Sequence, residues 1–396
     1  MVQRLSQRVQ QIAPSATMSV DAKTKALLQA GQPVVNMSVG EPDFDTPVAA
    51  AFAGVQAIVN GNTRYTAAAG TVELRRAIAE KLARENGLAY TPNQIVVSSG
   101  AKHTLYNIFM SILDPGDEVI VPAPYWVSYP EQIRLAGGVP VVVESDESTG
   151  FKMTPERLAA ALTKKTKAVL LNSPNNPTGA VYNASELRAL GDVLQNHDCL
   201  IVTDEIYEKL VYGVEYTSFA AACPDLMDRT LLVNGFSKAF AMTGWRLGYV
   251  ACAEDLATAM ASLQSHGTGS PSTMSQAAGL AAFAAFNSDV VSAFWRRRDV
   301  LVAGLRNIAG IECELPDGAF YVFPNVRAAF GRAYEGRVIG NALDYAEVLL
   351  EKHWVATVPG DAFGAPNNIR LSYATSLQNV EEALRRIQDF HRVLGL

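Results

Sequence analysis

The stretch Thr230–Gly248 reads TLLVNGFSKAFAMTGWRLG, and the fold prediction starts from it. It opens with Thr230–Asn234, an apolar run typical of a strand that is covered on both faces. A loop rich in small residues follows directly and carries Lys238 and Arg246. Because α/β sheets place their functional sites in loops at the carboxyl ends of strands, we expect this loop to form part of such a site.

The chemistry expected of this loop rests on its lysine and its arginine. A lysine among small and apolar residues is poorly hydrated, which lowers its pKa and favours imine formation with a carbonyl group. Arg246 is a permanent cation whose planar fork suits a phosphate group. An isolated Ser-Lys pair would be interpreted as a solvated surface feature, but the whole string Gly235–Gly248 favours a functional loop.

Six further strand patterns alternate with helix patterns along the middle of the chain. In Val72–Asn86, Leu74, Ile78 and Leu82 recur every fourth residue, and Thr154-Pro155 is typical of a helix start. Strands that alternate with helices predict an α/β domain with a largely parallel sheet. The expected strands are Gln94–Ser98, Glu118–Pro122, Pro140–Glu144, Lys167–Asn172, Cys199–Asp204 and Leu247–Ala251.

The two ends of the chain differ from the middle and predict a second domain. A charged helix is expected from about Asp289, and another is expected over Ser376–Val393. We therefore predict a large domain over residues 48–290, and a smaller α+β domain that combines residues 1–47 with 291–396. Residues 256–288 contain no Asp, Glu, Lys or Arg, which predicts buried structure near an interface.

Composition excludes several classes of protein. The 33 Lys and Arg against 39 Asp and Glu give a net charge of −6, so no basic field is available for nucleic acid or an anionic membrane. No segment reaches the ~18 apolar residues of a membrane span, and the N-terminus has no signal-peptide pattern. Charged residues make up 18% of the chain, below the usual ~25%, which favours surface lost to a subunit interface. Four scattered cysteines predict reduced thiols in the cytoplasm.

Common catalytic motifs are absent from the sequence. There is no GxxxxGK[ST] loop, no GxGxxG after the first strand, no HExxH and no GxSxG. The five histidines are spread along the chain and no pair has metal-ligand spacing, so we expect no metal site.

The string Gly235–Gly248 resembles the cofactor-attachment sequence of the class I pyridoxal-phosphate-dependent aminotransferases. The resemblance runs from about Leu5 to Val393, and within the family it is similar to the bacterial aspartate aminotransferases of the aspartate/prephenate subgroup. It implies fold type I, with a mostly parallel seven-stranded sheet in the large domain. It also implies pyridoxal 5'-phosphate as cofactor and a homodimer with shared active sites.

The resemblance assigns three catalytic residues. Lys238 would form the imine with the cofactor and move the proton of the substrate's α-carbon. Asp204, at the end of an expected strand, would keep the pyridine nitrogen protonated. Tyr207 and Asn176 would donate to the 3'-oxygen of the cofactor. The Asn176–Pro177 bond is predicted to be cis.

The phosphate of the cofactor is expected at the start of a helix. Small residues after the strand Gln94–Ser98 expose backbone amides at a positive helix end. The resemblance assigns Trp126 to stack on the cofactor ring, and Tyr65 to reach the phosphate of the neighbouring subunit. The phosphate cradle that it implies comprises Gly100, Ala101, Lys102, Ser237 and Arg246.

Arg370 is the expected ligand of the substrate's α-carboxylate. It lies on an apolar strand, where an unpaired arginine would be costly, and this already favours a functional role. The resemblance places Gly40 in the loop that closes on the substrate, and Trp126 and Asn176 beside it. For a second carboxylate it implies Lys102, with Ser15 and Thr17.

These residues together predict transfer of an amino group between L-aspartate and 2-oxoglutarate by a ping-pong scheme, with amino acids and 2-oxo acids as the only partners besides a second copy of the chain. Alternatives are prephenate as the oxo acid, which would give arogenate, or a broader aromatic specificity. The same scaffold also supports β-elimination, decarboxylation and cyclopropane-forming lyases. A ligand sensor fused to a DNA-binding module is disfavoured, because only ~45 residues precede the α/β region.

Overall fold

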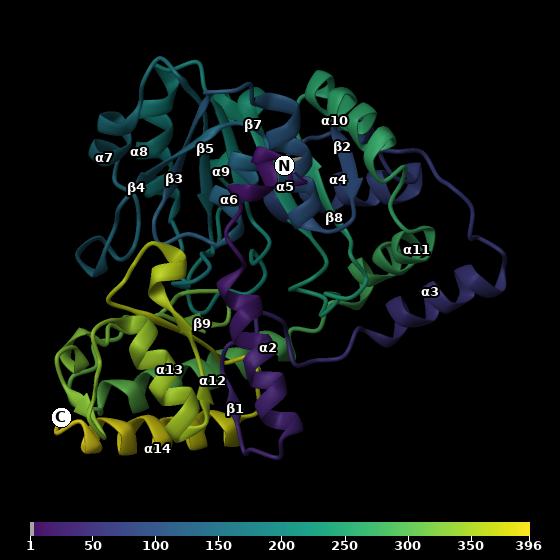
Figure 1. Ribbon diagram of the computed structural model, residues 1–396. Coiled ribbons are helices and arrows are strands. Elements are labelled where there is room, and N and C mark those ends of the chain that lie inside the picture. Colours follow the sequence, from purple (N-terminus) through teal and green to yellow (C-terminus); the bar gives the residue numbers. More distant parts are fainter. Residues whose placement is uncertain (1–3) are drawn as a thin grey trace.

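The computed structural model describes residues 4–396, and a seven-stranded sheet is its central element (Figure 1). The strands run in the order β2-β8-β7-β6-β5-β3-β4, and only the two pairs that involve β8 are antiparallel. The predicted α/β class and largely parallel sheet are confirmed. The strands are β2 (Ile95–Ser98), β3 (Glu118–Pro122), β4 (Val139–Val143), β5 (Thr166–Asn172), β6 (Leu200–Asp204), β7 (Thr230–Gly235) and β8 (Gly248–Ala251).

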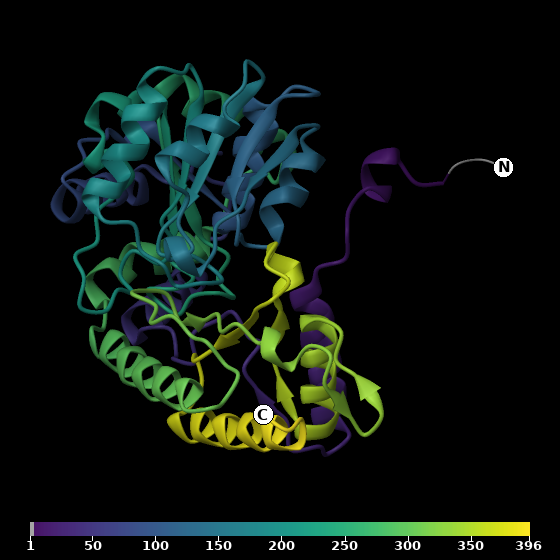
Figure 2. The same ribbon diagram turned by 90° about the vertical axis from the view of Figure 1, so that its left-hand side faces the viewer.

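Helices lie on both faces of this sheet, which explains why its strands are nearly continuous apolar runs (Figure 2). Along β5, Ala168 and Leu170 face one helical layer, whereas Val169 and Leu171 face the other. The covering helices are α4 (Val72–Asn86), α5 (Ala101–Ile112), α6 (Ser128–Leu135), α7 (Pro155–Ala161), α8 (Ala184–Gln195), α9 (Phe219–Ala222) and α10 (Glu254–Gly267).

Local sequence signals set the helix ends. The Thr71 hydroxyl accepts from the Leu74 amide at the start of α4, and Gly87 ends that helix with a φ of 69°. At the start of α7, the Thr154 hydroxyl accepts from the Arg157 amide, as its sequence predicts.

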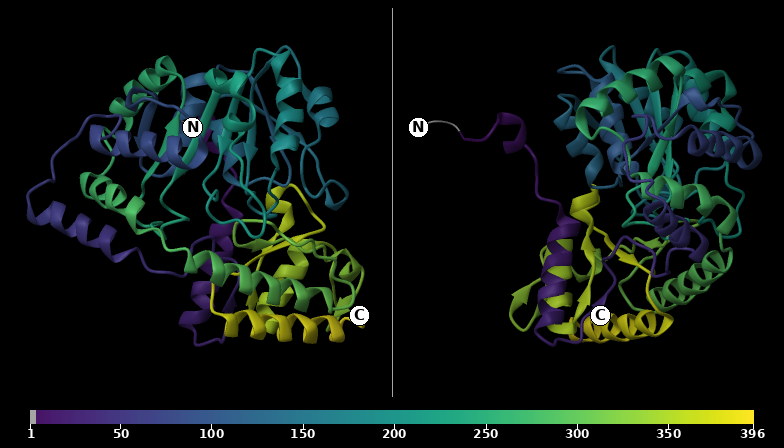
Figure 3. Two further views of the ribbon diagram at one scale, coloured as in Figure 1. Left: turned by 180° about the vertical axis from the view of Figure 1, so that it is seen from behind. Right: turned by 90° about the vertical axis from the view of Figure 1, so that its right-hand side faces the viewer.

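A smaller body lies below the sheet in Figure 1 and is built from both ends of the chain. Its three-stranded sheet is antiparallel, in the order β13-β14-β9, and β1 near the N-terminus pairs in parallel with β12. Helices α12 and α14 run side by side along its outer edge (Figure 3). Its elements are β1 (Val35–Asn36), α2 (Ala16–Gln29), α12 (Asp289–Arg306), β9 (Tyr321–Val322), α13 (Ala342–His353), β12 (Val355–Ala356), β13 (Val358–Pro359), β14 (Ile369–Ser372) and α14 (Leu377–Val393).

We call residues 48–290 the sheet body, and residues 4–47 with 291–396 the small body. The two share a core, because Ile206–Tyr212, which directly follows β6, packs among the apolar residues of the small body. That they are separate domains, with this boundary, stays a prediction. The remaining elements are α1 (Gln7–Gln10), α3 (Val48–Val59), α11 (Thr273–Ala282), β10 (Ala333–Tyr334) and β11 (Arg337–Val338).

One backbone prediction is wrong. The cis peptide bonds of the described chain are Ala123–Pro124 and Ser173–Pro174, so the Asn176–Pro177 bond is trans. The Asn176 amide is held there by the Asn172 side chain, whose Oδ1 accepts at 2.9 Å.

Among residues 4–396, no single helix is long and apolar enough to cross a bilayer. Only the pair Thr273–Ala285 and Asp289–Arg306, bent by 77°, passes on combined length and composition.

Candidate active site

Lys238 lies in the loop after β7, at the carboxyl edge of the sheet. Its ammonium donates to the Gly40 carbonyl oxygen, and it lies 5.8 Å from the ring centre of Tyr207 and 5.6 Å from that of Phe320. Burial, together with the nearby cations Arg370 and Arg246, lowers the pKa of Lys238 to about 8, against the charges of Glu41 and Asp204, which raise it. A substantial fraction of this amine is therefore neutral at physiological pH, as proton abstraction requires.

Asp204 ends β6 and is only 4% exposed. The Tyr129 hydroxyl donates to its Oδ2 at 2.8 Å, and the Ile206 amide donates to its Oδ1 at 3.2 Å. Burial raises the pKa of this carboxyl to about 6, against these two hydrogen bonds and the charge of Lys238, which lower it. A buried carboxyl without a direct cationic partner suits a ligand that brings a positive charge.

Arg370 lies on β14, facing the sheet body, and is 2% exposed. Its Nη1 donates to the Asn176 side-chain oxygen and its Nη2 to the Ser38 carbonyl, both at 2.8 Å. Its buried Nε has no hydrogen-bond partner, and within residues 4–396 no carboxylate pairs with the guanidinium. Burial lowers its pKa. Because a buried cation is costly without an anion, Arg370 is poised for an anionic ligand.

Tyr207 contributes a phenol to the same region. Its hydroxyl is hydrogen-bonded to that of Tyr321 at 2.9 Å, and burial raises its pKa well above the usual value. The Tyr321 ring also lies 4.5 Å from the Arg370 guanidinium. The structure thus brings Lys238, Asp204, Tyr207, Asn176, Arg370 and Gly40 together between the two bodies, as the sequence predicts.

At the start of α5, other groups pack so closely against the backbone that a side chain on Gly100 or Gly248 would collide with them. Gly100 precedes the helix with a φ of 92°, and a Cβ there would lie 2.5 Å from Nη2 of Arg246. A Cβ on Gly248 would lie 2.3 Å from the Ala101 nitrogen. Within residues 4–396 no side chain caps this helix, so its first amides are free to bind an anion. The adjoining lysine loop supplies the buried Ser237.

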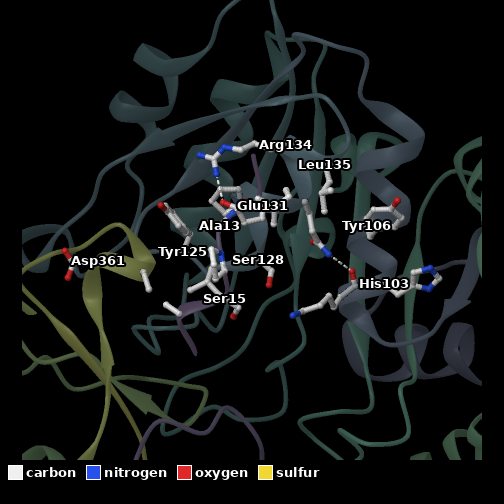
Figure 4. Close-up of a pocket in the computed structure, with 18 of the residues that line it drawn as sticks. Ala13, Ser15, His103, Tyr106, Tyr125, Ser128, Glu131, Arg134, Leu135 and Asp361 are labelled. Atoms are coloured by element: carbon white, nitrogen blue, oxygen red, sulfur yellow. Dashed lines mark hydrogen bonds and ion pairs between the residues drawn. The ribbon is translucent and has the colours of Figure 1, made fainter. Parts of the chain in front are cut away.

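A cavity of about 910 Å³ opens beside this helix start (Figure 4). Ser15, Lys102 and Arg246 line it, and the Ser15 hydroxyl is 3.0 Å from that of Thr17. The Lys102 ammonium lies 4.7 Å from the ring centre of Trp126, and burial together with Arg246 lowers its pKa. The Trp126 ring packs edge-on against Tyr129, the hydrogen-bond donor to Asp204.

Tyr65 stands apart from this arrangement. Its side chain is 94% exposed, and it forms no hydrogen bond or ring contact within the described chain. Its contact with the phosphate of a neighbouring subunit stays a prediction.

Several residues that shape the site were missed from the sequence. Tyr129 follows Trp126 by three positions, so a helix beginning between them would bring both to one side. Asn172 pairs with Asp204 in the parallel register of β5 and β6. The ring of Phe363, 5.1 Å from Arg370, comes from a loop that carries no sequence signal.

The comparisons agree with this fold and with the predicted enzyme class. The family model described as aminotransferase class I and II matches residues 32–387, and the chain belongs to that family. It is 48% identical over 391 residues to the aspartate aminotransferase of Geobacillus stearothermophilus, with 98% of each chain covered. It is 46% identical over 394 residues to the aspartate/prephenate aminotransferase of Nitrosomonas europaea, covering 97% of this chain and 98% of that one.

A solved structure shows the same likeness in three dimensions. The aspartate aminotransferase of Thermus thermophilus with maleate matches with a TM-score of 0.92 at 46% identity, over 99% of this chain and 100% of that chain. The predicted family, enzyme class and fold are therefore confirmed, and the chain is an aminotransferase.

Proposed function

We propose that this aminotransferase moves the amino group between L-aspartate and 2-oxoglutarate, forming oxaloacetate and L-glutamate. The observation that carries the proposal is Arg370, a buried guanidinium that pairs with no carboxylate among residues 4–396. A second cation, Lys102, lines the cavity of about 910 Å³. Two cations suit a substrate with two carboxylates. Relatives named aspartate aminotransferase, and one structure containing the dicarboxylate maleate, support this choice.

Pyridoxal 5'-phosphate is the proposed cofactor, and the residues present fit it. Lys238 is a partly buried amine with a lowered pKa, and Asp204 is a buried carboxyl that suits a protonated ring nitrogen. The uncapped start of α5, where a Cβ on Gly100 would meet Arg246, suits a phosphate. When bound, the cofactor supplies an electron sink for the α-carbon and carries the amino group between two substrates.

The protein's own groups then move the proton, hold the cofactor and the substrate in place, and exclude water. The neutral Lys238 amine would take the proton from the substrate's α-carbon as a general base, and would then deliver it as a general acid to the cofactor carbon that carries the amino group. Asp204 holds positive charge at the ring nitrogen, and Tyr207 and Asn176 orient the ring. Arg370 fixes the α-carboxylate so that the α-proton faces Lys238. Closure of the small body excludes water.

Lys102, Ser15 and Thr17 are proposed to hold the second carboxylate. Lys102 is a point charge and not a rigid fork, so it tolerates carboxylates in different positions. This tolerance, the cavity of about 910 Å³ and the relative named aspartate/prephenate aminotransferase favour prephenate as a second oxo acid.

We also propose a homodimer with shared active sites. Helix α3 lies at the edge of the molecule in Figure 1, beside α11, and five of its large apolar side chains face solvent. Such a face on a single chain marks a subunit interface. The exposed Tyr65 follows this helix and would reach the neighbour's phosphate site. The exposed residues are Val48, Phe52, Val55, Ile58 and Val59.

We place this activity in the cytoplasm, with small molecules and a second copy of the chain as partners. The four cysteines are buried as free thiols, which suits a reducing compartment (Cys199, Cys223, Cys252 and Cys313).

The test is a steady-state assay with purified holoenzyme. L-Aspartate with 2-oxoglutarate should yield equal amounts of oxaloacetate and L-glutamate, and the Lys238→Ala variant should yield neither. Replacing 2-oxoglutarate by prephenate should yield arogenate if prephenate is a second oxo acid. Release of ammonia and pyruvate from a β-substituted amino acid, without transfer, would instead indicate an elimination enzyme and contradict the proposal.

A further inference from the structure

A loop of the sheet body is hydrogen-bonded to two residues of the small body, one of which lies two positions before Arg370. The Glu147 side-chain oxygen Oε1 accepts from the side-chain amides of Asn325 and Asn368, each at 3.1 Å. Glu147 belongs to the sheet body, whereas both asparagines belong to the small body. We call these three residues the Glu147 clasp. None of the roles assigned above involves them.

The clasp acts on the strand that carries Arg370. Asn368 lies two positions before Arg370 and is 3% exposed, and its side chain also donates to the Phe323 carbonyl at 3.1 Å. Asn325 and Asn368 form an isolated antiparallel bridge. One carboxylate therefore ties together the segment that follows β9 and the segment that leads into β14. Because one side-chain oxygen accepts both hydrogen bonds, the contact fixes the two segments relative to the loop that carries Glu147.

A row of aromatic rings extends the same contact to the guanidinium. Phe151, from the same loop as Glu147, packs edge-on against Phe323 with ring centres 5.8 Å apart. Phe323 packs in the same way against Phe363, also at 5.8 Å. The Phe363 ring flanks the Arg370 guanidinium at 5.1 Å. A shift of the loop would therefore be transmitted to Arg370 through both hydrogen bonds and rings.

The loop itself is held in a defined shape. The Asp146 side chain accepts from the Ser148 amide at 3.0 Å, and Gly150 ends the short turn Glu147–Thr149 with a φ of 60°. Phe151 has a φ of 57°, an unusual value for a residue with a side chain. Because the loop has a fixed shape, it can determine the position of the small-body segments that Glu147 contacts.

We propose that Glu147 is a positioning residue, which sets how the small body closes on the sheet body and thereby places Arg370 for the substrate carboxylate. This inference rests on the proposed function, because it takes the carboxylate of an amino acid as the ligand of Arg370. Glu147 does not touch the reacting atoms. Its removal weakens the binding of every substrate that Arg370 holds, and leaves the proton transfer at Lys238 intact.

The experiment compares three variants of the holoenzyme. Glu147→Ala should raise KM for both L-aspartate and 2-oxoglutarate by roughly tenfold, with kcat within about twofold, since a small misplacement weakens binding. Glu147→Gln should stay near wild type, because its amide oxygen can accept the same two hydrogen bonds. Glu144→Ala removes an exposed carboxylate from the same region and should change nothing.

Hydrogen exchange gives a readout that needs no substrate. In Glu147→Ala, the amides of β14 should exchange faster than in wild type, Glu147→Gln and Glu144→Ala. Asn325→Ala, which removes one donor from the other side, should show the same change. This arm separates the two proposals: if wild type does not transaminate aspartate, the proposed function fails, and exchange in β14 still decides the clasp.

The proposal is refuted if Glu147→Ala has wild-type KM values and its β14 amides exchange at the wild-type rate. It is also refuted if KM rises as much in Glu147→Gln as in Glu147→Ala. The charge of Glu147, and not its geometry as a hydrogen-bond acceptor, would then matter. A fall in kcat at unchanged KM would likewise contradict a positioning role.

Discussion

At the scale of single residues, the site is defined by two buried charged groups that hydrogen-bond only to neutral groups among residues 4–396. Asp204 is a buried carboxyl held only by a phenol and an amide, and Arg370 is a buried guanidinium held only by neutral oxygens. In a core with only a structural role, each of these buried charges would lower the stability of the fold. Both are explained if the missing partners are a cationic ring nitrogen and a substrate carboxylate.

Asp204 gives a pH prediction for the cofactor-free protein. Its pKa is about 6 in the folded chain, above the ordinary value of 3.8, so the folded state binds more protons between about pH 4 and pH 6. Stability should therefore fall as pH rises through this window. Asp204→Asn should remove that loss and gain on the order of 1 to 3 kcal/mol at pH 7. Thermal unfolding of both proteins at pH 4.5 and pH 7 measures it.

The same variant should lose catalysis while gaining stability. Asp204→Asn cannot hold the positive charge at the ring nitrogen, so kcat should fall by a factor on the order of a hundred or more. A variant that is both less stable at pH 7 and fully active would contradict the role given to Asp204.

Arg370 gives a second prediction at this scale. Arg370→Met replaces a buried unpaired cation by an apolar side chain, so the free protein should be no less stable than wild type. KM for L-aspartate should rise by a factor on the order of a hundred, because a charged hydrogen-bond pair is lost. Unfolding in urea and steady-state kinetics provide the two measurements. A destabilised variant with wild-type KM would show that Arg370 serves the core instead.

At the scale of elements, one added carbon atom at Gly100 should disturb the proposed phosphate site at the start of α5. Gly100→Ala adds a Cβ that would lie 2.5 Å from Nη2 of Arg246. Cofactor affinity, measured by equilibrium dialysis, should fall by roughly tenfold, since the displaced arginine and helix start bind the phosphate.

Gly116→Ala is the matched control for this variant. Gly116 has a φ of 95°, close to the 92° of Gly100, but a Cβ there meets nothing within 4 Å. Both variants should lose roughly 1 kcal/mol of stability from backbone strain, and only Gly100→Ala should bind the cofactor more weakly. Equal cofactor affinity in the two variants would contradict the cradle.

The elements themselves were largely predictable, because the signals for them are local. All seven strands of the central sheet were expected within one or two residues, since their apolar runs are flanked by polar loops. The antiparallel direction of β8 was not expected, because direction depends on the path between strands and not on their composition. The Asn176–Pro177 bond was assigned wrongly for a related reason, as surrounding contacts select the isomer.

The site residues were predictable where they belong to a motif, and not where they depend on packing. Lys238, Asp204 and Arg370 follow from the family resemblance and from burial of charge. Tyr129 and Phe363 reach the site only through tertiary contacts, and the Glu147 clasp joins segments far apart in sequence. No local pattern encodes such contacts.

At the scale of the whole molecule, the exposed apolar face of α3 predicts how the chain assembles. Phe52→Glu places a charge within that face, so the proposed dimer should dissociate and activity should fall with it. Val393→Glu is the control, because Val393 is a similarly exposed apolar residue at the end of α14. Light scattering during gel filtration distinguishes the two states. An active monomer of Phe52→Glu would contradict the shared active site.

The central claim is that Lys238, Asp204 and Arg370 together perform amino-group transfer from a dicarboxylic amino acid. The most direct test is a single turnover without any oxo acid, in which holoenzyme is mixed with L-aspartate and the cofactor absorbance is followed by stopped flow. We predict one equivalent of oxaloacetate per chain and no ammonia, with slow or no reaction for L-alanine and none for Lys238→Ala. Ammonia release, or equally fast conversion of L-alanine, would contradict the account.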